Sequence, residues 1–352
     1  MQRRDFLGRV GAAAAGAAIR PFVPAPAFRV WTWVHGDGDL SLAEWRRRFA
    51  RIRTAGITGV LVGGGEVQLL GEAAHSEGLT FHRWTWILNR TGDAWAKEHH
   101  PEWFIVSRKG DSSLTTPPYV GYYQWVCPNR APVREYLRGL VAQIAREPGV
   151  DAVHFDYIRF PDVILPVGLW AKYGLVQDHE FPEYDFCYCE VCRGRFAEQS
   201  GRDPLDLPDP PADEAWRRFR WDSVTGLVRE LADAVHAQGR EVSAAVFPTP
   251  TLARRLVRQA WEQWPLDAVF PMLYHGFYQE PVSWIGTAAE QGVAALPAGR
   301  PLYAGLYLPD LAPADLADAI RSARDGGASG VSLFEMGGLT DGHLMALGKV
   351  GL

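Results

Sequence analysis

From residue 28 to the C-terminus, short apolar runs typical of strands alternate with segments whose apolar residues recur at the period of an α-helix. This alternation is typical of βα units and a parallel sheet. The predicted strands are 28–34, 58–63, 79–88, 151–157, 241–247, 266–273, 302–307 and 330–335. The predicted helices are 41–56, 67–77, 132–147, 212–238, 252–263, 282–296, 312–325 and 341–349.

Eight strand–helix pairs in one chain fit a single (β/α)8 TIM barrel over residues 28–352. Two connections are much longer than the rest: the loop 89–129 after the third strand, and a Cys-containing insertion, 158–211, after the fourth. The alternative is an open, doubly wound sheet. The run Gly63-Gly64-Gly65 lacks the spacing and the downstream partner of a dinucleotide-binding fingerprint. We therefore predict an α/β TIM barrel with no organic cofactor.

The stretch 151–162 carries the strongest chemical signal. It begins as a buried strand and ends in the polar groups His154, Asp156, Tyr157, Arg159 and Asp162. Since side chains alternate along a strand, His154 and Asp156 are expected on the same side. Active sites of TIM barrels lie at the carboxyl ends of the strands. Asp156 is therefore predicted to lie at the centre of an active site.

Other carboxylates are also expected at strand ends: Asp37, Asp39, Glu66, Asp162 and Glu335. Glycoside hydrolysis uses two such groups, a proton donor with a raised pKa and a nucleophile or base. Asp156 is the candidate nucleophile or base, with Arg159 placed to keep it ionised. Glu335 follows an otherwise apolar strand and is the candidate acid. For each residue the alternative is a structural ion pair or a loop cap.

Fourteen Trp residues provide many flat apolar faces. Such faces stack on sugar rings, although Trp also fills protein cores. The predicted substrate-binding residues are Trp31, Trp33, Trp84, Trp86, His154, Tyr157, Arg159, Tyr274 and His275. The alternative for one member of each alternating Trp pair is packing against the outer helices.

The four cysteines point to a metal site. Cys187, Cys189 and Cys192 are close in sequence, and Cys127 is the only other thiol. Three thiols this close cannot all pair with one another, whereas four thiolates complete a tetrahedral zinc site. A disulfide between Cys127 and one of the three is the alternative in an oxidising compartment. A four-thiolate site would be structural and would hold the insertion in place.

The N-terminus predicts export. Arg3 and Arg4 precede a weakly apolar, Ala/Gly-rich run, and Ala25-Pro26-Ala27 follows it. We interpret residues 1–27 as a twin-arginine signal peptide, which implies a periplasmic or extracellular protein. No membrane span is expected downstream. The net charge of −5 and the lack of a basic patch predict no nucleic-acid partner, and nothing indicates an oligomeric state.

Several motifs resemble a known family. The chain is similar to exported TIM-barrel glycoside hydrolases of the glycosyl-hydrolase-like family 10 type. The resemblance lies in three runs, 100–103, 126–129 and His154–Pro161, of which the last is the most specific. That resemblance implies Asp156 as the catalytic carboxylate and an oligo- or polysaccharide as substrate. The run 187–192 resembles the zinc cluster of family 42 β-galactosidases, with Cys127 as the fourth ligand. Their catalytic pair has no counterpart in this chain, because the fourth strand carries His-Phe-Asp and the seventh carries no carboxylate.

Three functions follow as hypotheses. The first is a secreted glycoside hydrolase that uses Asp156 and Glu335. The second is a non-catalytic glycan-binding protein on a degenerate barrel. The third is a metal-dependent hydrolase, such as a deacetylase, with His35, Asp37 and Asp39 as ligands beside His154 or His275.

Overall fold

A computed structural model describes residues 27–350. Within that range, eight parallel strands form one sheet in the order β6-β5-β4-β3-β2-β1-β8-β7. Isolated parallel bridges from Val269 to Leu302 and from Met272 to Gly305 join the β6 and β7 segments, so the barrel nearly closes. The predicted TIM barrel is confirmed. The predicted leader, residues 1–27, lies almost wholly outside the described residues.

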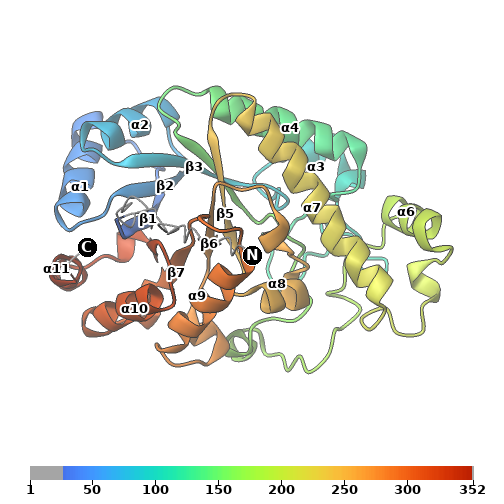
Figure 1. Cartoon of the computed structure of the whole chain (residues 1–352). Coiled ribbons are helices and arrows are strands. Elements are labelled where there is room, and N and C mark those ends of the chain that lie inside the picture. The colour runs from blue at the N-terminus through green and yellow to red at the C-terminus, as the bar shows by residue number, and fades with distance from the viewer. Residues whose placement is uncertain (1–26, 351–352) are drawn as a thin grey trace, which may run out of the picture.

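Helices surround the sheet, with α1 beside α2 and α4 beside α7 (Figure 1). The strands are β1 (Arg29–His35), β2 (Gly59–Gly63), β3 (Thr80–Trp86), β4 (Ala152–Asp156), β5 (Glu241–Val246), β6 (Ala268–Pro271), β7 (Tyr303–Tyr307) and β8 (Gly330–Phe334). The helices are α1 (Leu42–Thr54), α2 (Val67–Ser76), α3 (Ala94–His99), α4 (Ala131–Arg146), α5 (Trp170–Tyr173), α6 (Glu190–Ser200), α7 (Glu214–His236), α8 (Pro250–Val257), α9 (Trp284–Ala295), α10 (Pro313–Asp325) and α11 (Asp341–Lys349).

Helix α8 departs most from its predicted range, 252–263. It begins earlier because the Thr249 side chain accepts a hydrogen bond from the backbone N–H of Leu252 and Pro250 occupies the first turn. It ends at Val257 because Arg258 adopts a left-handed conformation, with φ of 59°. The three short helices α3, α5 and α6 were not predicted, since they lie within the two long connections.

The apolar core has two layers, as expected for a barrel. The larger layer lies between the sheet and the outer helices. The smaller layer fills the barrel interior with the inward side chains of alternate strand positions, among them Trp31, Trp33, Trp84 and Phe270. Trp31 and Trp33 are each 1% exposed, so they belong to this packed interior.

A small polar cluster is enclosed in the same interior. Ser243 Oγ lies 2.9 Å from His82 Nδ1 and 2.8 Å from His154 Nδ1. Both imidazoles are fully buried, and burial lowers the pKa of His82 to about 3 and holds the pKa of His154 well below its ordinary value. The interior is therefore built for neutral histidines.

This cluster predicts acid sensitivity. Since the folded chain holds His82 with a depressed pKa, the unfolded chain binds more protons between pH 6.5 and about 3. The free energy of unfolding is therefore unaffected by His82 above pH 6.5. It falls as the pH is lowered toward about 3, by a total on the order of a few kcal/mol. Chemical unfolding at several pH values should show a shallower acid decline for His82→Gln than for the wild type. The exposed His99→Gln should decline as the wild type does. Equal slopes for all three would contradict the prediction.

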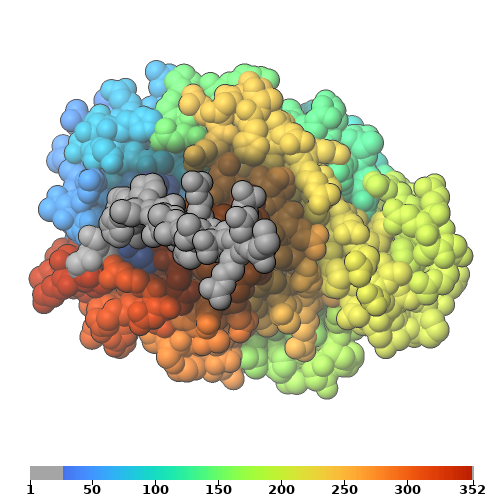
Figure 2. Space-filling view, viewed as in Figure 1, coloured from blue at the N-terminus to red at the C-terminus, as the bar shows by residue number. Residues whose placement is uncertain are grey.

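The insertion 158–211 is fixed to the barrel by buried ion pairs. Asp185 pairs with Arg220 of α7, and Glu180 pairs with Arg258 at the end of α8. The space-filling view shows α6 and its surroundings as a lobe beside the barrel (Figure 2). No helix within residues 27–350 has the length and apolar character needed to cross a bilayer.

Candidate active site

A cavity of about 330 Å³ opens at the carboxyl end of the barrel. We call it the aromatic cavity, because most of its wall is formed by rings. These rings include Trp84, Trp86, Tyr122, Tyr123, Tyr157, Phe247, Tyr274, Tyr307 and Phe334. One side is closed by the insertion, through the segment 165–173. The shape and lining fit a neutral ligand with flat apolar faces.

Asp156 lies in this cavity as the last residue of β4. Its Oδ2 accepts a hydrogen bond from Trp84 Nε1 (3.0 Å), and its Oδ1 accepts one from the backbone N–H of Tyr157 (2.6 Å). Burial raises the pKa of the Asp156 carboxyl, and these two hydrogen bonds, together with the charge of Arg159, offset only part of that effect. A raised pKa is the property required of a carboxyl that acts as a proton donor.

Arg159 forms its ion pair with Asp162 and not with Asp156, although its charge lowers the pKa of the Asp156 carboxyl in the direction expected from the sequence. Its Nη1 donates to Asp162 Oδ2 (3.1 Å) and to the Phe160 carbonyl (3.0 Å). Asp162 also accepts a bond from the Tyr123 hydroxyl (3.3 Å). Nearby Asp162 raises the pKa of Arg159 despite the opposing effect of burial. This buried ion pair stiffens one wall of the aromatic cavity, and Arg159 acts on Asp156 only through its charge, without a direct ion pair.

Glu335 directly follows β8, and its Oε2 lies 2.7 Å from His35 Nε2. His35 is the last residue of β1 and lines the aromatic cavity, with its ring 5.1 Å from that of Trp84. Both side chains are accessible, at 34% for Glu335 and 52% for His35. In the strand order, β4 and β8 lie on opposite sides of the barrel. Asp156 and Glu335 therefore lie at the ends of strands on opposite sides of the barrel; Asp156 lines the aromatic cavity, whereas Glu335 adjoins it through His35.

The other predicted binding residues divide into two groups. Trp84, Trp86, Tyr157, Arg159 and Tyr274 line the aromatic cavity. Trp31, Trp33, His154 and His275 do not; the first three are packed inside the barrel, and His275 is buried beside the cavity. For the three strand residues, alternation determines the side on which each points but not its depth below the mouth. His275 lies instead in the short 3-10 helix that follows β6.

Sequence reasoning missed part of the site. His35 had been considered only as a metal ligand, although its position at a strand end was a usable signal. Tyr307, at the end of β7, carried the same signal. Phe247 carried it too, at the end of the predicted strand 241–247. The contributions of Tyr122 and the insertion had no such signal, because they lie in loops whose paths the periodicity does not predict.

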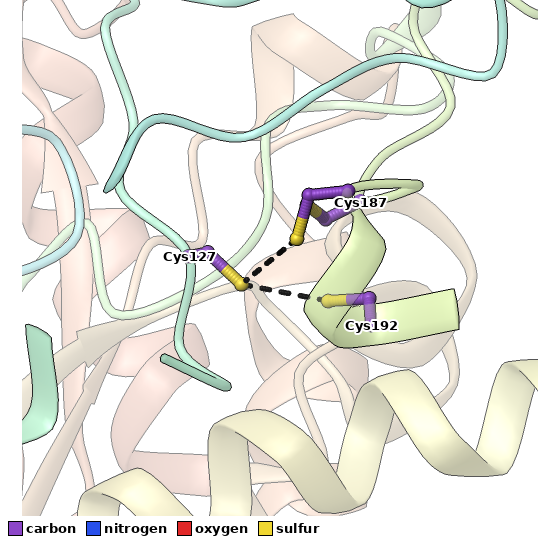
Figure 3. A group of neighbouring side chains, drawn as sticks. Cys127, Cys187 and Cys192 are labelled. Atoms are coloured by element: carbon purple, nitrogen blue, oxygen red, sulfur yellow. Dashed lines mark hydrogen bonds between the residues drawn. The ribbon is translucent and has the colours of Figure 1, made fainter. Parts of the chain in front are cut away.

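The cysteines are the only potential metal-binding group of three or more side chains in residues 27–350. The four sulfurs lie within 4.8 Å of one another, all are buried, and all are unpaired. Cys127 comes from the loop after β3 and faces the cysteines of the insertion (Figure 3). Tetrahedral Zn–S bonds of about 2.3 Å would place sulfurs about 3.8 Å apart. The Cys127–Cys192 and Cys127–Cys189 distances are 3.4 and 3.7 Å.

Nearby donors also suit thiolates. The Asn129 backbone N–H donates to Cys127 Sγ (3.4 Å), and its Nδ2 donates to Cys192 Sγ (3.3 Å). Such outer contacts orient metal ligands. By contrast, His35, Asp37 and Asp39 form no such group: His35 contacts Glu335, and Asp37 accepts a bond from Gly65 N–H (3.1 Å). The residues assigned to a metal-dependent hydrolase are therefore not assembled as a ligand set.

Fold and cavity define this chain as a TIM-barrel protein whose mouth carries an aromatic cavity with a protonatable carboxyl. A family model described as a putative glycosyl hydrolase domain matches residues 87–294, more than half of the chain. The chain belongs to that family. The match includes β4 with Asp156 and all four cysteines. A search of curated proteins finds no match.

Solved structures share the fold. The catalytic domain of a β-amylase from Paenibacillus polymyxa has a TM-score of 0.61 at 10% identity, covering 92% of this chain and 95% of that one. A class V chitinase from Pseudomonas fluorescens has a TM-score of 0.52 at 13% identity, covering 92% and 99%. The GH36 α-galactosidase AgaA from Geobacillus stearothermophilus has a TM-score of 0.55 at 11% identity, covering 93% and 41%. At these identities the likeness concerns the barrel alone.

Proposed function

We propose that this protein is a secreted glycoside hydrolase that cleaves an oligo- or polysaccharide. The observation that carries the proposal is Asp156, a carboxyl with a raised pKa on the wall of an aromatic cavity. Membership of the glycosyl hydrolase domain family supports the same class of reaction. The predicted leader, 1–27, is the basis for including secretion.

In the proposed reaction, Asp156 gives its proton to the glycosidic oxygen while the bond from that oxygen to the anomeric carbon breaks. Glu335, across the mouth, either attacks the anomeric carbon or takes a proton from the attacking water. If Glu335 is the base, water bonds to the anomeric carbon, Glu335 takes the water's proton, and proton exchange with solvent restores Asp156 and Glu335. If Glu335 is the nucleophile, water then displaces it from the anomeric carbon and gives its proton to Asp156, so one water is consumed by either route. These roles reverse the sequence-based assignment, because Asp156 has the raised pKa and Glu335 lies beside the His35 imidazole. Rings such as Trp86 and Tyr274 would hold the sugar.

A product screen tests this proposal. The chain from residue 28 would be incubated with bacterial, plant and host glycans, and released sugars would be detected by mass spectrometry. We expect new reducing ends from at least one glycan. Tight glycan binding without any product would instead support the glycan-binding alternative. One observation favours that alternative. Hydrolysis uses two carboxylates, and the second carboxylate that lines the aromatic cavity, Asp162, is already paired with Arg159.

The pH profile gives a sharper prediction. Since the proton of Asp156 is needed, activity should fall as the pH rises through its raised pKa. The Trp84 hydrogen bond favours the ionised carboxylate, so Trp84→Phe should raise this pKa further and move the alkaline limb to higher pH. Trp86→Phe is the matched control, because Trp86 lines the same wall without a bond to Asp156. A limb that moves equally in both variants would contradict this role for Trp84.

We also infer that the four cysteines bind one structural zinc ion. Their spacing, burial and Asn129 contacts support this assignment. Such a closed site would hold the insertion against the loop after β3 and take no part in bond cleavage.

A further inference from the structure

A second cavity, of about 640 Å³, adjoins the aromatic cavity. We call it the polar cavity, because its wall carries Asp37, Arg83, Thr85, Thr91, Gln143 and Glu147. The two cavities share three lining residues, His35, Trp84 and Trp86. The two cavities therefore adjoin at these side chains, one of which, Trp84, is the hydrogen-bond partner of Asp156.

The polar cavity arises from the way the helices cover β3. Helix α2 packs on α1, and α4 packs on α7 (Figure 1). The outward side chains of β3, Arg83 and Thr85, consequently line a space between the start of α2 and the face of α4. The long loop 89–129 replaces a direct turn into the next helix and contributes Thr91 and Gly92 to the rim.

The Trp84 side chain, which both cavities share, is packed against β2. A Cβ on Gly63 would come within 2.7 Å of Trp84 Cε3, so the Trp84 ring lies directly against the β2 backbone. On the other side of β2, Arg83 Nη1 donates to the Gly64 carbonyl, which fixes the guanidinium within the polar cavity. Burial lowers the pKa of Arg83, and the nearby acids, Asp37 first among them, oppose that effect.

The linings of the two cavities suit two parts of one ligand. The aromatic cavity offers ring faces and one protonatable carboxyl. The polar cavity offers planar donors and acceptors of both charges, which match hydroxyl groups because each hydroxyl both donates and accepts. A chain of sugar units presents flat faces and many hydroxyls along its whole length.

We propose that the two cavities form one continuous saccharide-binding cleft, in which a glycan chain bound at Asp156 extends past Trp86 into the polar cavity. The protein would then act on polymers and cut within the chain, with sugar units bound on both sides of the reacting bond. This inference rests on the proposed function for the position of the cut, but the binding of an extended chain can be measured without turnover.

The test blocks the polar cavity and leaves the shared residues intact. Gly92 lines that cavity, and a Cβ added there meets nothing within 4 Å. Gly92→Trp should therefore fold and fill the cavity. Gly139→Trp is the matched control, because Gly139 is an exposed glycine of α4 outside both cavities, with equal free space around it.

The probes are malto-, cello-, xylo- and chito-oligosaccharide ladders from dimer to hexamer. In the Asp156→Asn variant, affinity should rise with chain length. The ratio of the affinity for the hexamer to that for the dimer should fall at least about tenfold when Gly92→Trp is added. Gly139→Trp should leave the gain unchanged. In the active chain, labelled hexamers should yield internal fragments, and Gly92→Trp should lower kcat/KM for long substrates while sparing short ones.

Two failures are distinguishable. Affinity that does not depend on chain length, or falls equally in both Trp variants, would overturn the continuous cleft and leave Asp156 catalysis standing. Length-dependent binding that Gly92→Trp weakens, together with no product from any ladder or glycan, would uphold the cleft and overturn the hydrolase. Absence of binding to every ladder would overturn the cleft as well.

Discussion

Replacement of Asp156 by Asn should lower kcat by about 10²–10⁴-fold on any glycan that the wild type hydrolyses, the range expected for loss of a general acid. The side chain keeps its size, and its oxygen can still accept the Trp84 hydrogen bond, but its amide group is not acidic enough to transfer a proton to the glycosidic oxygen. KM should change little, because the rings that hold the sugar remain. Initial rates over a substrate series, with released sugars quantified by mass spectrometry, would measure both constants.

The control is Asp39→Asn, which removes an exposed carboxylate after β1 that lines neither cavity. It should retain wild-type kcat. Full activity in Asp156→Asn would move the active site elsewhere on the barrel. Equal loss in Asp39→Asn would instead revive the metal-dependent hydrolase, for which Asp39 was a proposed ligand.

The location of Asp156 illustrates what a sequence can predict in this fold. Strand periodicity and the general rule for TIM barrels were enough to place it at the carboxyl end of β4. Glu335 was placed at the end of β8 in the same way. Both predictions depend only on local alternation and on the strand order, which the eight βα units determine.

The depth and pairing of side chains were less predictable. Trp31 and Trp33 point inward as alternation requires, yet both lie below the mouth, because β1 continues to His35. Arg159 was assigned to Asp156, whereas it pairs with Asp162 three residues later. Sequence proximity could not separate these partners, since the choice depends on how the chain turns after Tyr157, where φ is 48°.

The insertion was the least predictable part, and it forms one wall of the site. Leu165, Leu169 and Tyr173 line the aromatic cavity, and the cysteines at 187–192 follow shortly after. Trp170 Nε1 donates to the Leu165 carbonyl, and Leu165 N–H donates to Gln177 Oε1, both at 2.8 Å. The wall is also joined to α8 by hydrogen bonds from Phe160 N–H to the Val257 carbonyl and from Val163 N–H to the Leu256 carbonyl, so its position depends on how the insertion is held to the barrel.

Loss of the cysteine site should consequently affect both stability and the cleft. We expect about one zinc per chain in the purified protein, measured by mass spectrometry of the metal. Cys192→Ser should lose that zinc and be destabilised by several kcal/mol, because a structural zinc contributes its binding free energy to folding. KM should also rise, since the wall at 165–173 loses support. Chelation of the wild type should reproduce the loss of stability.

Gly194→Ser is the matched control, because it introduces a serine on the same helix at an exposed position with nothing within 4 Å of the new Cβ. It should keep the zinc and the stability of the wild type. Titration of thiols separates the remaining outcomes. Four free thiols without metal would contradict the zinc assignment, and so would thiols lost as pairs and recovered with a reductant. The second result would instead support the disulfide alternative involving Cys127. Because Cys127 lies on the loop after β3 and the other three on the insertion, either chemistry would still join the two long connections that shape the cleft.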